Sequence, residues 1–120
     1  MSEITELNKN LIDTSNEISI KSGEINKARM TYLTLKDEYE RDYSSAIVQI
    51  KTTNPDLTQT DIRAIAIGQS YNKKLELRVA EGEYRALMTG LKALQDKLTT
   101  LQEMCYNIRS EMRLTNNFIK

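Results

Sequence analysis

Cationic side chains recur through the second half of this 120-residue chain at the spacing of one helix face. Arg78, Arg85 and Lys92 are seven residues apart, so in a helix they lie on one side at intervals of about 10 Å. Lys74 lies one turn before Arg78, and Tyr71 begins the same row. Such a row can follow a phosphate backbone through charge alone, and a tyrosine beside it can stack on unpaired bases.

The excess of positive charge is local, because the whole chain has 17 Lys plus Arg and 17 Asp plus Glu. We take as candidate nucleic-acid-binding residues Arg63, Tyr71, Lys73, Lys74, Arg78, Arg85 and Lys92. The alternative is that these cations pair with Glu on a facing helix, as is common beside the seam of helical hairpins. Repetition of a weak patch in a symmetric oligomer would strengthen binding through avidity.

Residues for catalysis or metal binding are scarce. The chain has no His and one Cys, which removes the commonest general base and metal ligand and rules out an internal disulfide. Carboxylates cluster at residues 37–42 and at Glu81 and Glu83, with no Gly-rich phosphate loop beside them, so solvated helix faces explain them. We therefore expect a protein that is not an enzyme, with no catalytic residues, no metal site and no cofactor.

Apolar residues recur every seven positions, which predicts helices rather than strands. In the first half an unbroken series runs from Ile4 to Ala46, and its partner positions three residues later are apolar only in part. From Tyr39 the apolar stripe can move to Tyr43 and on to Ile50, a phase shift that coiled coils tolerate.

The second half carries two complete series. Its predicted hairpin and oligomer seam is Leu77, Tyr84, Leu87, Leu91, Leu94, Leu98, Leu101 and Ile108, and Cys105 fills a seam position as a small apolar side chain. Gly82 and Gly90 fall inside this helix at a cost of about 1 kcal/mol each relative to Ala, so we expect a neighbouring helix to cross closely there.

The helical pattern is interrupted near the middle by Pro55. Thr58 with Asp61 three residues later resembles a capping box, which marks the start of a helix. A short apolar stretch follows at residues 63–67, and Gly68 either ends it or is absorbed into one continuous helix.

These elements predict an all-α single domain over residues 1–120. We expect a long, coiled-coil-like antiparallel two-helix hairpin, with helices over about 3–52 and about 61–115, a turn over about 53–60, and room for a short helix at the turn. Two helices bury one stripe each, which leaves apolar residues outside the seam: Ile12, Ile20, Leu33, Val48, Val79 and Leu114. We therefore expect a homo-oligomer.

The second helix also resembles a known family. The stretches 74–77 (KLEL), 80–87 (AEGEYRAL), 91–94 (LKAL) and 106–109 (YNIR) resemble the C-terminal helix of UvsY-like phage recombination mediators. Residues 30–39 are loosely similar to their N-terminal helix, so the resemblance covers about residues 25–113. It implies a ring-forming helical protein that binds single-stranded DNA and helps a recombinase displace single-strand-binding protein. The family's basic patch would fall on Arg63, Lys73, Lys74 and Arg78.

The leading hypothesis is therefore a non-enzymatic, oligomeric accessory protein that binds single-stranded DNA and assists recombination or replication. Its partners would be itself, single-stranded DNA and a recombinase or single-strand-binding protein. The alternative is a coiled-coil interaction adaptor, assembly scaffold or inhibitor of a host protein that binds no nucleic acid. The chain has no apolar run long enough for a membrane span and no secretory signal in MSEITELNKN, so we expect a cytoplasmic protein, in the host cytoplasm if phage-encoded.

Overall fold

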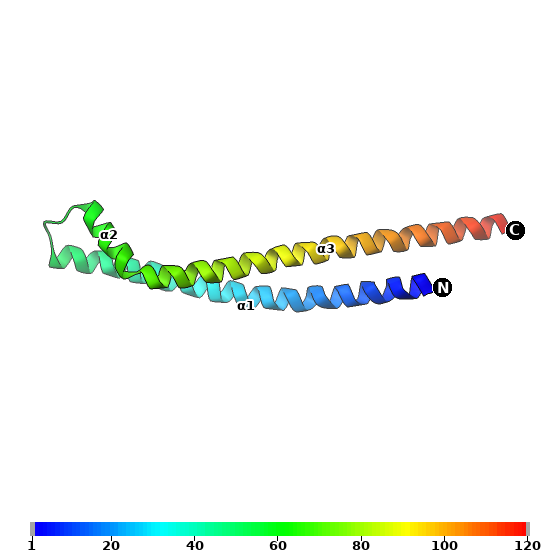
Figure 1. The fold of residues 1–120 in the computed structure, drawn as a ribbon, viewed down its shortest axis with the longest axis horizontal. Helices are drawn as coiled ribbons and strands as arrows, with labels where there is room; N and C mark the ends of the chain where they lie inside the picture. Colours follow the sequence, from blue (N-terminus) through cyan, green and yellow to red (C-terminus); the bar gives the residue numbers. More distant parts are fainter. Residues whose placement is uncertain (1, 120) are drawn as a thin grey trace. The chain divides into compact units, whose positions relative to one another are not determined.

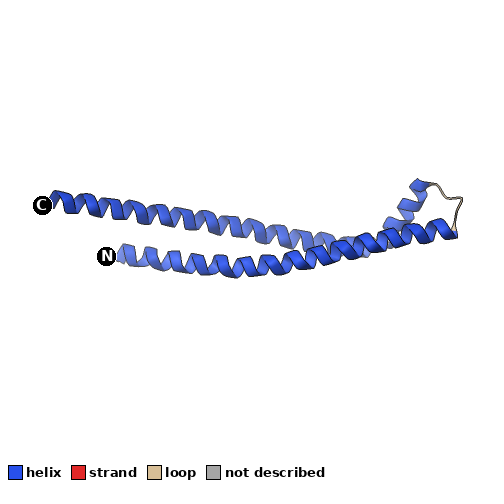
Figure 2. Ribbon diagram, turned by 180° about the vertical axis from the view of Figure 1, so that it is seen from behind, coloured by secondary structure: helices blue, strands red, loops and turns tan. Residues whose placement is uncertain are grey.

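The computed structural model describes the backbone of residues 2–119 and the side chains of residues 3–115. Three helices form in chain order: α1 (Ser2–Thr53), α2 (Gln59–Gln69) and α3 (Tyr71–Ile119). The two long helices run antiparallel, and the short α2 lies at the turn between them (Figure 1). Within the described residues only the loop before α2 and the junction after it lie outside a helix (Figure 2). The prediction of an all-α antiparallel hairpin is confirmed.

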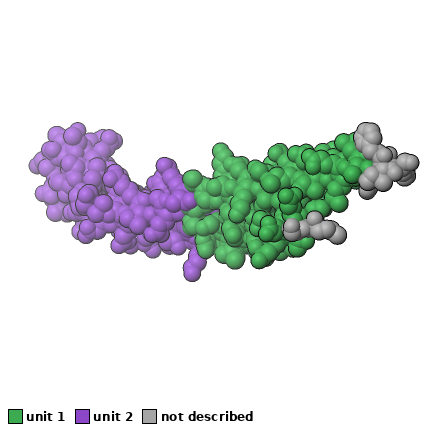
Figure 3. All heavy atoms as spheres, turned by 45° about the vertical axis from the view of Figure 1, so that its right-hand side comes forward, with its two compact units in different colours: residues 1–24, 87–120 green, residues 25–86 purple. Residues whose placement is uncertain are grey.

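Contacts along the chain divide it into two compact units (Figure 3). Unit 1 contains residues 1–24 and 87–120, and unit 2 contains residues 25–86. Each unit pairs a stretch of α1 with a stretch of α3, whereas the turn and α2 belong to unit 2 alone.

The core of unit 1 follows the seven-residue pattern. Leu7 of α1 is buried with Leu101 and Cys105 of α3, and Leu11 and Ile108 pack against them. These positions are three or four residues apart in each helix, so each helix buries one stripe and leaves its other faces to solvent.

A buried hydroxyl interrupts the apolar stripe of α1 in unit 1. Thr14 is only 1% exposed, and its Oγ1 has no hydrogen-bond partner among the described atoms. An unpartnered hydroxyl away from water reduces stability, so this position weakens the pairing of the two helices.

The stripe of α1 changes phase in unit 2. Tyr43 is half-buried, and Ala46 and Ile50 are buried, whereas Asp42 and Gln49 are exposed. The predicted shift of the stripe from Tyr39 through Tyr43 to Ile50 is confirmed. The shift turns Ala46 and Ile50 towards α2, where they form a cluster with two of its residues.

The turn is closed by backbone bonds and a helix cap. Asn54, whose following proline disfavours a helical conformation, donates its N–H to the Ile50 carbonyl at 2.8 Å. Thr58 is the N-cap of α2, since its Oγ1 accepts the Asp61 N–H at 3.2 Å. The predicted helix start is confirmed. α2 buries Ile62 in the cluster with Ala46 and Ile50.

The second half of the chain is not one continuous helix. Gly68 stays inside α2, and the break falls at Ser70, which has φ −96° and ψ 7° and is buried. The Ser70 N–H donates to the Ala66 carbonyl, and the Ser70 carbonyl accepts the Lys74 N–H, each at 3.0 Å. The break therefore costs little hydrogen bonding while it changes the helix direction and lets Ala66 become fully buried.

Candidate functional site: the outer faces of the helices

The candidate cations fall into different environments. In unit 2, Arg63 and Arg78 are exposed, and Lys73 and Lys74 are half-buried. Lys92 is exposed in unit 1. The structure thus places the first part of the predicted row in unit 2 and its last member in unit 1.

Two of the candidate cations are engaged in ion pairs. The Lys73 Nζ donates to Glu38 Oε2 of α1 at 2.9 Å and lies 4.0 Å from a Glu76 carboxylate oxygen. The hydrogen bond to Glu38, with the attraction of that carboxylate, raises the pKa of Lys73 above its ordinary value. Arg85 pairs with Glu81 one turn earlier. Lys73 thus pairs with Glu on the facing helix, as the alternative expected, whereas Arg85 pairs within its own helix.

Three candidate residues lie together on one side of α3 in unit 2. Tyr71, Lys74 and Arg78 follow one another at intervals of three and four residues, which places them on one helix face. Within residues 3–115, neither Lys74 nor Arg78 forms an ion pair. This trio, named here the cationic face, is the part of the predicted patch with charge available for a ligand.

The predicted seam residues face inward. Leu101 is buried, and the others are half-buried: Leu77, Tyr84, Leu87, Leu91, Leu94, Leu98 and Ile108. In unit 2 the Tyr84 ring stacks on Tyr32 of α1, with centroids 6.0 Å apart and planes 1° from parallel. These side chains fill the space between α1 and α3 inside each unit.

The apolar residues predicted to lie outside the seam are exposed: Ile12, Ile20, Leu33, Val48, Val79 and Leu114. The structure adds further exposed apolar residues that the sequence interpretation missed, among them Met30, Leu75 and Tyr106. The exposure of these three residues could have been predicted from the sequence, because each lies outside the seven-residue seam of its helix. Exposed apolar side chains occur in both units, so the helix pair leaves much of its apolar surface uncovered.

We expected another helix to cross closely at Gly82 and Gly90 of α3, and the space around each glycine tests this expectation. A Cβ at Gly82 would have no heavy atom of a neighbouring element within 4 Å, and at Gly90 it would meet the Lys21 Cε at 3.9 Å, an ordinary contact. The chain itself therefore makes no close helix approach at Gly82, which is exposed. The sequence-based expectation is wrong for this position within one chain.

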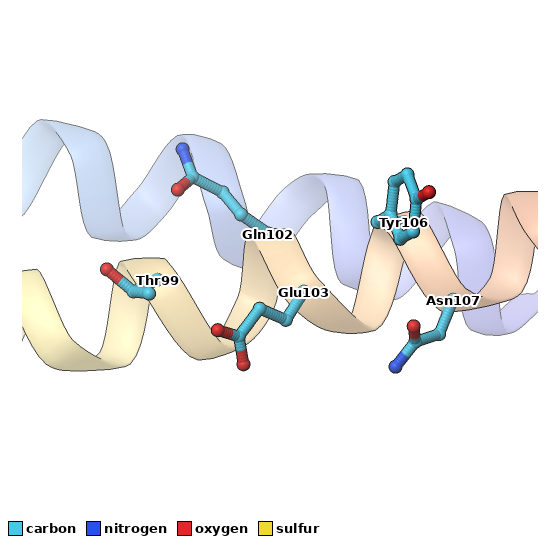
Figure 4. A pocket seen from close by; sticks show the side chains of 5 residues that line it. All are labelled: Thr99, Gln102, Glu103, Tyr106 and Asn107. Atoms are coloured by element: carbon cyan, nitrogen blue, oxygen red, sulfur yellow. The ribbon is translucent and has the colours of Figure 1, made fainter.

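The hollows on the surface offer little chemistry. One of about 380 Å³ lies along α3 in unit 1, where Figure 4 shows Thr99, Gln102, Glu103, Tyr106 and Asn107. All five side chains come from one helix, with a single carboxylate among them. Across the described residues no group of three or more acidic or Cys side chains is placed to hold a metal ion.

The fold and these faces define a helical hairpin whose recognisable features are surfaces rather than a pocket. Comparisons with protein-family models, curated proteins and solved structures found no match. Among the described helices, none is long and apolar enough to cross a membrane.

Proposed function

We propose that this protein works as a self-associating helical hairpin, a scaffold whose exposed helix faces bind other protein surfaces, its own copies included. The observation that carries the proposal is the amount of apolar side chain outside both cores. In unit 2, Tyr71 and Val79 are 52% and 62% exposed, and in unit 1 Ile12 and Ile20 are 62% and 65% exposed. Large apolar side chains that the folded chain leaves uncovered are characteristic of protein interfaces when they gather on helix faces.

Light scattering coupled to size exclusion tests self-association directly. We expect a mass of a defined multiple of 13.8 kDa at micromolar concentration, with helical circular dichroism retained. A folded monomer across the micromolar range would contradict the proposal.

Single-stranded DNA binding is a second candidate, favoured by the cationic face. Lys74 and Arg78 are free of ion pairs among the described residues, and the exposed Tyr71 ring lies on the same side of α3. Such a surface supports phosphate contacts with base stacking. With the resemblance to UvsY-like mediators, it supports a role beside a recombinase or single-strand-binding protein.

The DNA-binding candidate predicts a salt-dependent affinity. Fluorescence anisotropy with labelled oligo-dT should give a negative slope of log affinity against log salt. Replacing Lys74 and Arg78 by Ala should reduce that slope, whereas the matched pair Lys97→Ala and Arg109→Ala, exposed in unit 1, should leave it nearly unchanged. No binding at low salt would exclude this candidate.

A further inference from the structure

The outer side of α1 in unit 2 carries apolar residues followed by acids. Met30, Leu33, Asp37 and Glu40 are spaced three or four residues apart, which places them on one side of the helix, and all four are exposed. Among the described residues, Asp37 and Glu40 form no ion pair. We name these four residues the α1 outer face.

The outer side of α3 in unit 2 carries the opposite charge. Lys74, Arg78 and Gly82 are spaced four residues apart, with Leu75 and Val79 beside them. Within residues 3–115 the two cations form no ion pair, and the space beside Gly82 is open, since a Cβ there would meet nothing within 4 Å. We name these five residues the α3 outer face.

The two outer faces match when they are laid side by side in opposite directions. With Asp37 opposite Arg78, Leu33 falls four residues to one side, opposite Gly82, and Glu40 falls three residues to the other, near Lys74. Both unpaired acids then meet unpaired cations, and a large apolar side chain enters the space that the glycine leaves. The parallel alignment is poorer, because with Asp37 opposite Arg78 it places Glu40 opposite Glu81, a like charge, and Leu33 opposite Lys74.

We propose that the α1 outer face of one copy docks antiparallel on the α3 outer face of a second copy, with Asp37 paired to Arg78. The inference rests on the self-association proposed above and names its surface. Like faces do not serve, since α1 on α1 opposes acids and α3 on α3 opposes cations, and juxtaposed like charges weaken an interface.

The α1 and α3 outer faces lie on the sides of the two helices away from their seam, so one partner copy cannot cover both, and the contact is heterologous. In a pair of copies, one keeps a free α3 outer face and the other a free α1 outer face, so the contact continues from copy to copy and closes only as a ring. An occupied α3 outer face also covers Lys74 and Arg78, so a copy and single-stranded DNA compete for it.

Charge reversal tests the pairing through complementation. Asp37→Arg alone and Arg78→Asp alone should each raise the dissociation constant at least about 30-fold, because like charges then meet at the contact. An equimolar mixture of the two variants should recover assembly, because the two reversed side chains attract each other at one contact and the native pair forms at the next. Control variants Glu103→Arg and Arg109→Asp, exposed in unit 1, should assemble like the wild type, and circular dichroism checks folding.

The outcomes separate the two proposals. A monomeric wild type overturns self-association itself. A wild type that assembles while both charge reversals assemble equally well, or while their mixture recovers nothing, overturns the docking surface alone. Loss of oligo-dT binding by Arg78→Asp with assembly intact also overturns it and assigns the α3 outer face to nucleic acid.

Glycine substitutions provide an independent check. Gly82→Leu should weaken assembly about tenfold or more, because the added side chain occupies the space assigned to Leu33. Gly23→Leu is the matched control, since Gly23 is an exposed α1 residue with nothing within 4 Å of a Cβ. Equal assembly by the two variants would contradict the proposed contact.

Discussion

The two units join α1 to α3 by different means. In unit 1 the regular seven-residue pattern brings Leu7 against Leu101 and Cys105. In unit 2 the pattern of α1 shifts, and α2 adds Ile62 and Ala66 to the core. A regular stripe can slide along its partner by whole repeats, whereas a shifted stripe capped by a third helix has one matching register. The core of unit 2 therefore fixes the register of its own stretches of α1 and α3.

The two units also differ in whether their polar groups have hydrogen-bond partners. Unit 2 satisfies its polar groups with the Thr58 cap and the Lys73–Glu38 pair. Unit 1 buries the Thr14 hydroxyl without a partner among the described atoms. The polar contacts therefore stabilise unit 2, whereas the unpartnered hydroxyl destabilises the helix pairing in unit 1.

The largest effect should come from removing the α2 contribution to unit 2. Ile62 is 5% exposed, so Ile62→Ala should lower the free energy of unfolding by about 2–4 kcal/mol through lost burial and the cavity left behind. Urea unfolding followed by circular dichroism measures it. Ile65→Ala in the same helix is the control, since Ile65 is 40% exposed and its truncation should cost about 0.5 kcal/mol or less. Equal losses would mean that α2 does not anchor unit 2.

Removing the unpaired hydroxyl of Thr14 should stabilise unit 1 and reduce its difference from unit 2. Thr14→Val keeps the side-chain shape and should raise the free energy of unfolding by about 1–2 kcal/mol, because a buried unsatisfied polar group is lost. Thermal and urea unfolding measure the change, and the exposed Thr100→Val is its control. A destabilised Thr14→Val would show that the hydroxyl has a partner in solution.

The cap of α2 should contribute less than its buried face. Thr58→Ala removes the acceptor for the Asp61 N–H and should cost about 1 kcal/mol. Thr58→Ser retains the hydroxyl and should recover most of the stability, while Thr60→Ala, inside α2 and exposed, serves as the control. Thr58→Ala and Thr58→Ser would be indistinguishable in urea unfolding if the cap were not formed.

The smallest effect belongs to the exposed ion pair between α1 and α3. Because Glu38 raises the pKa of Lys73 above 10.5, the pair's contribution is complete below pH 10.5 and is lost as the pH rises through the raised value. Lys73→Met should therefore lower the melting temperature slightly at pH 7, and the difference from the wild type should shrink above pH 10.5. Lys74 forms no ion pair within residues 3–115, so Lys74→Met should show no such pH dependence.

Most of the fold could be predicted because periodicity reports directly on which helix face is buried. The series from Ile4 to Ala46 and the shift at Tyr43 are visible in the sequence, and the structure buries or half-buries these positions as expected. The break at Ser70 could not be predicted, because Gly68 is the stronger local signal and the burial of Ala66, a tertiary contact, decides where the helix bends.

The candidate site was less predictable for a geometric reason. Lys73 and Lys74 are neighbours in sequence, yet consecutive helix residues are about 100° apart, so Lys73 reaches Glu38 and Lys74 does not. Choosing between them requires the rotation of α3 about its axis, and the pairing with Glu38 joins residues 35 positions apart. Sequence spacing predicts rows of charge but not which members are already neutralised.

Cys105 gives this chain a built-in probe of its own motion. It is the single thiol in the sequence and is 9% exposed between α1 and α3 of unit 1. A thiol reagent can reach it efficiently only when the two helices separate there, so the labelling rate measures how often unit 1 opens. The labelling rate can be compared between the wild type and variants at Thr14, in unit 1, or Ile62, in unit 2. A change caused by the Ile62 variant would measure how strongly the stability of unit 2 affects the opening of unit 1.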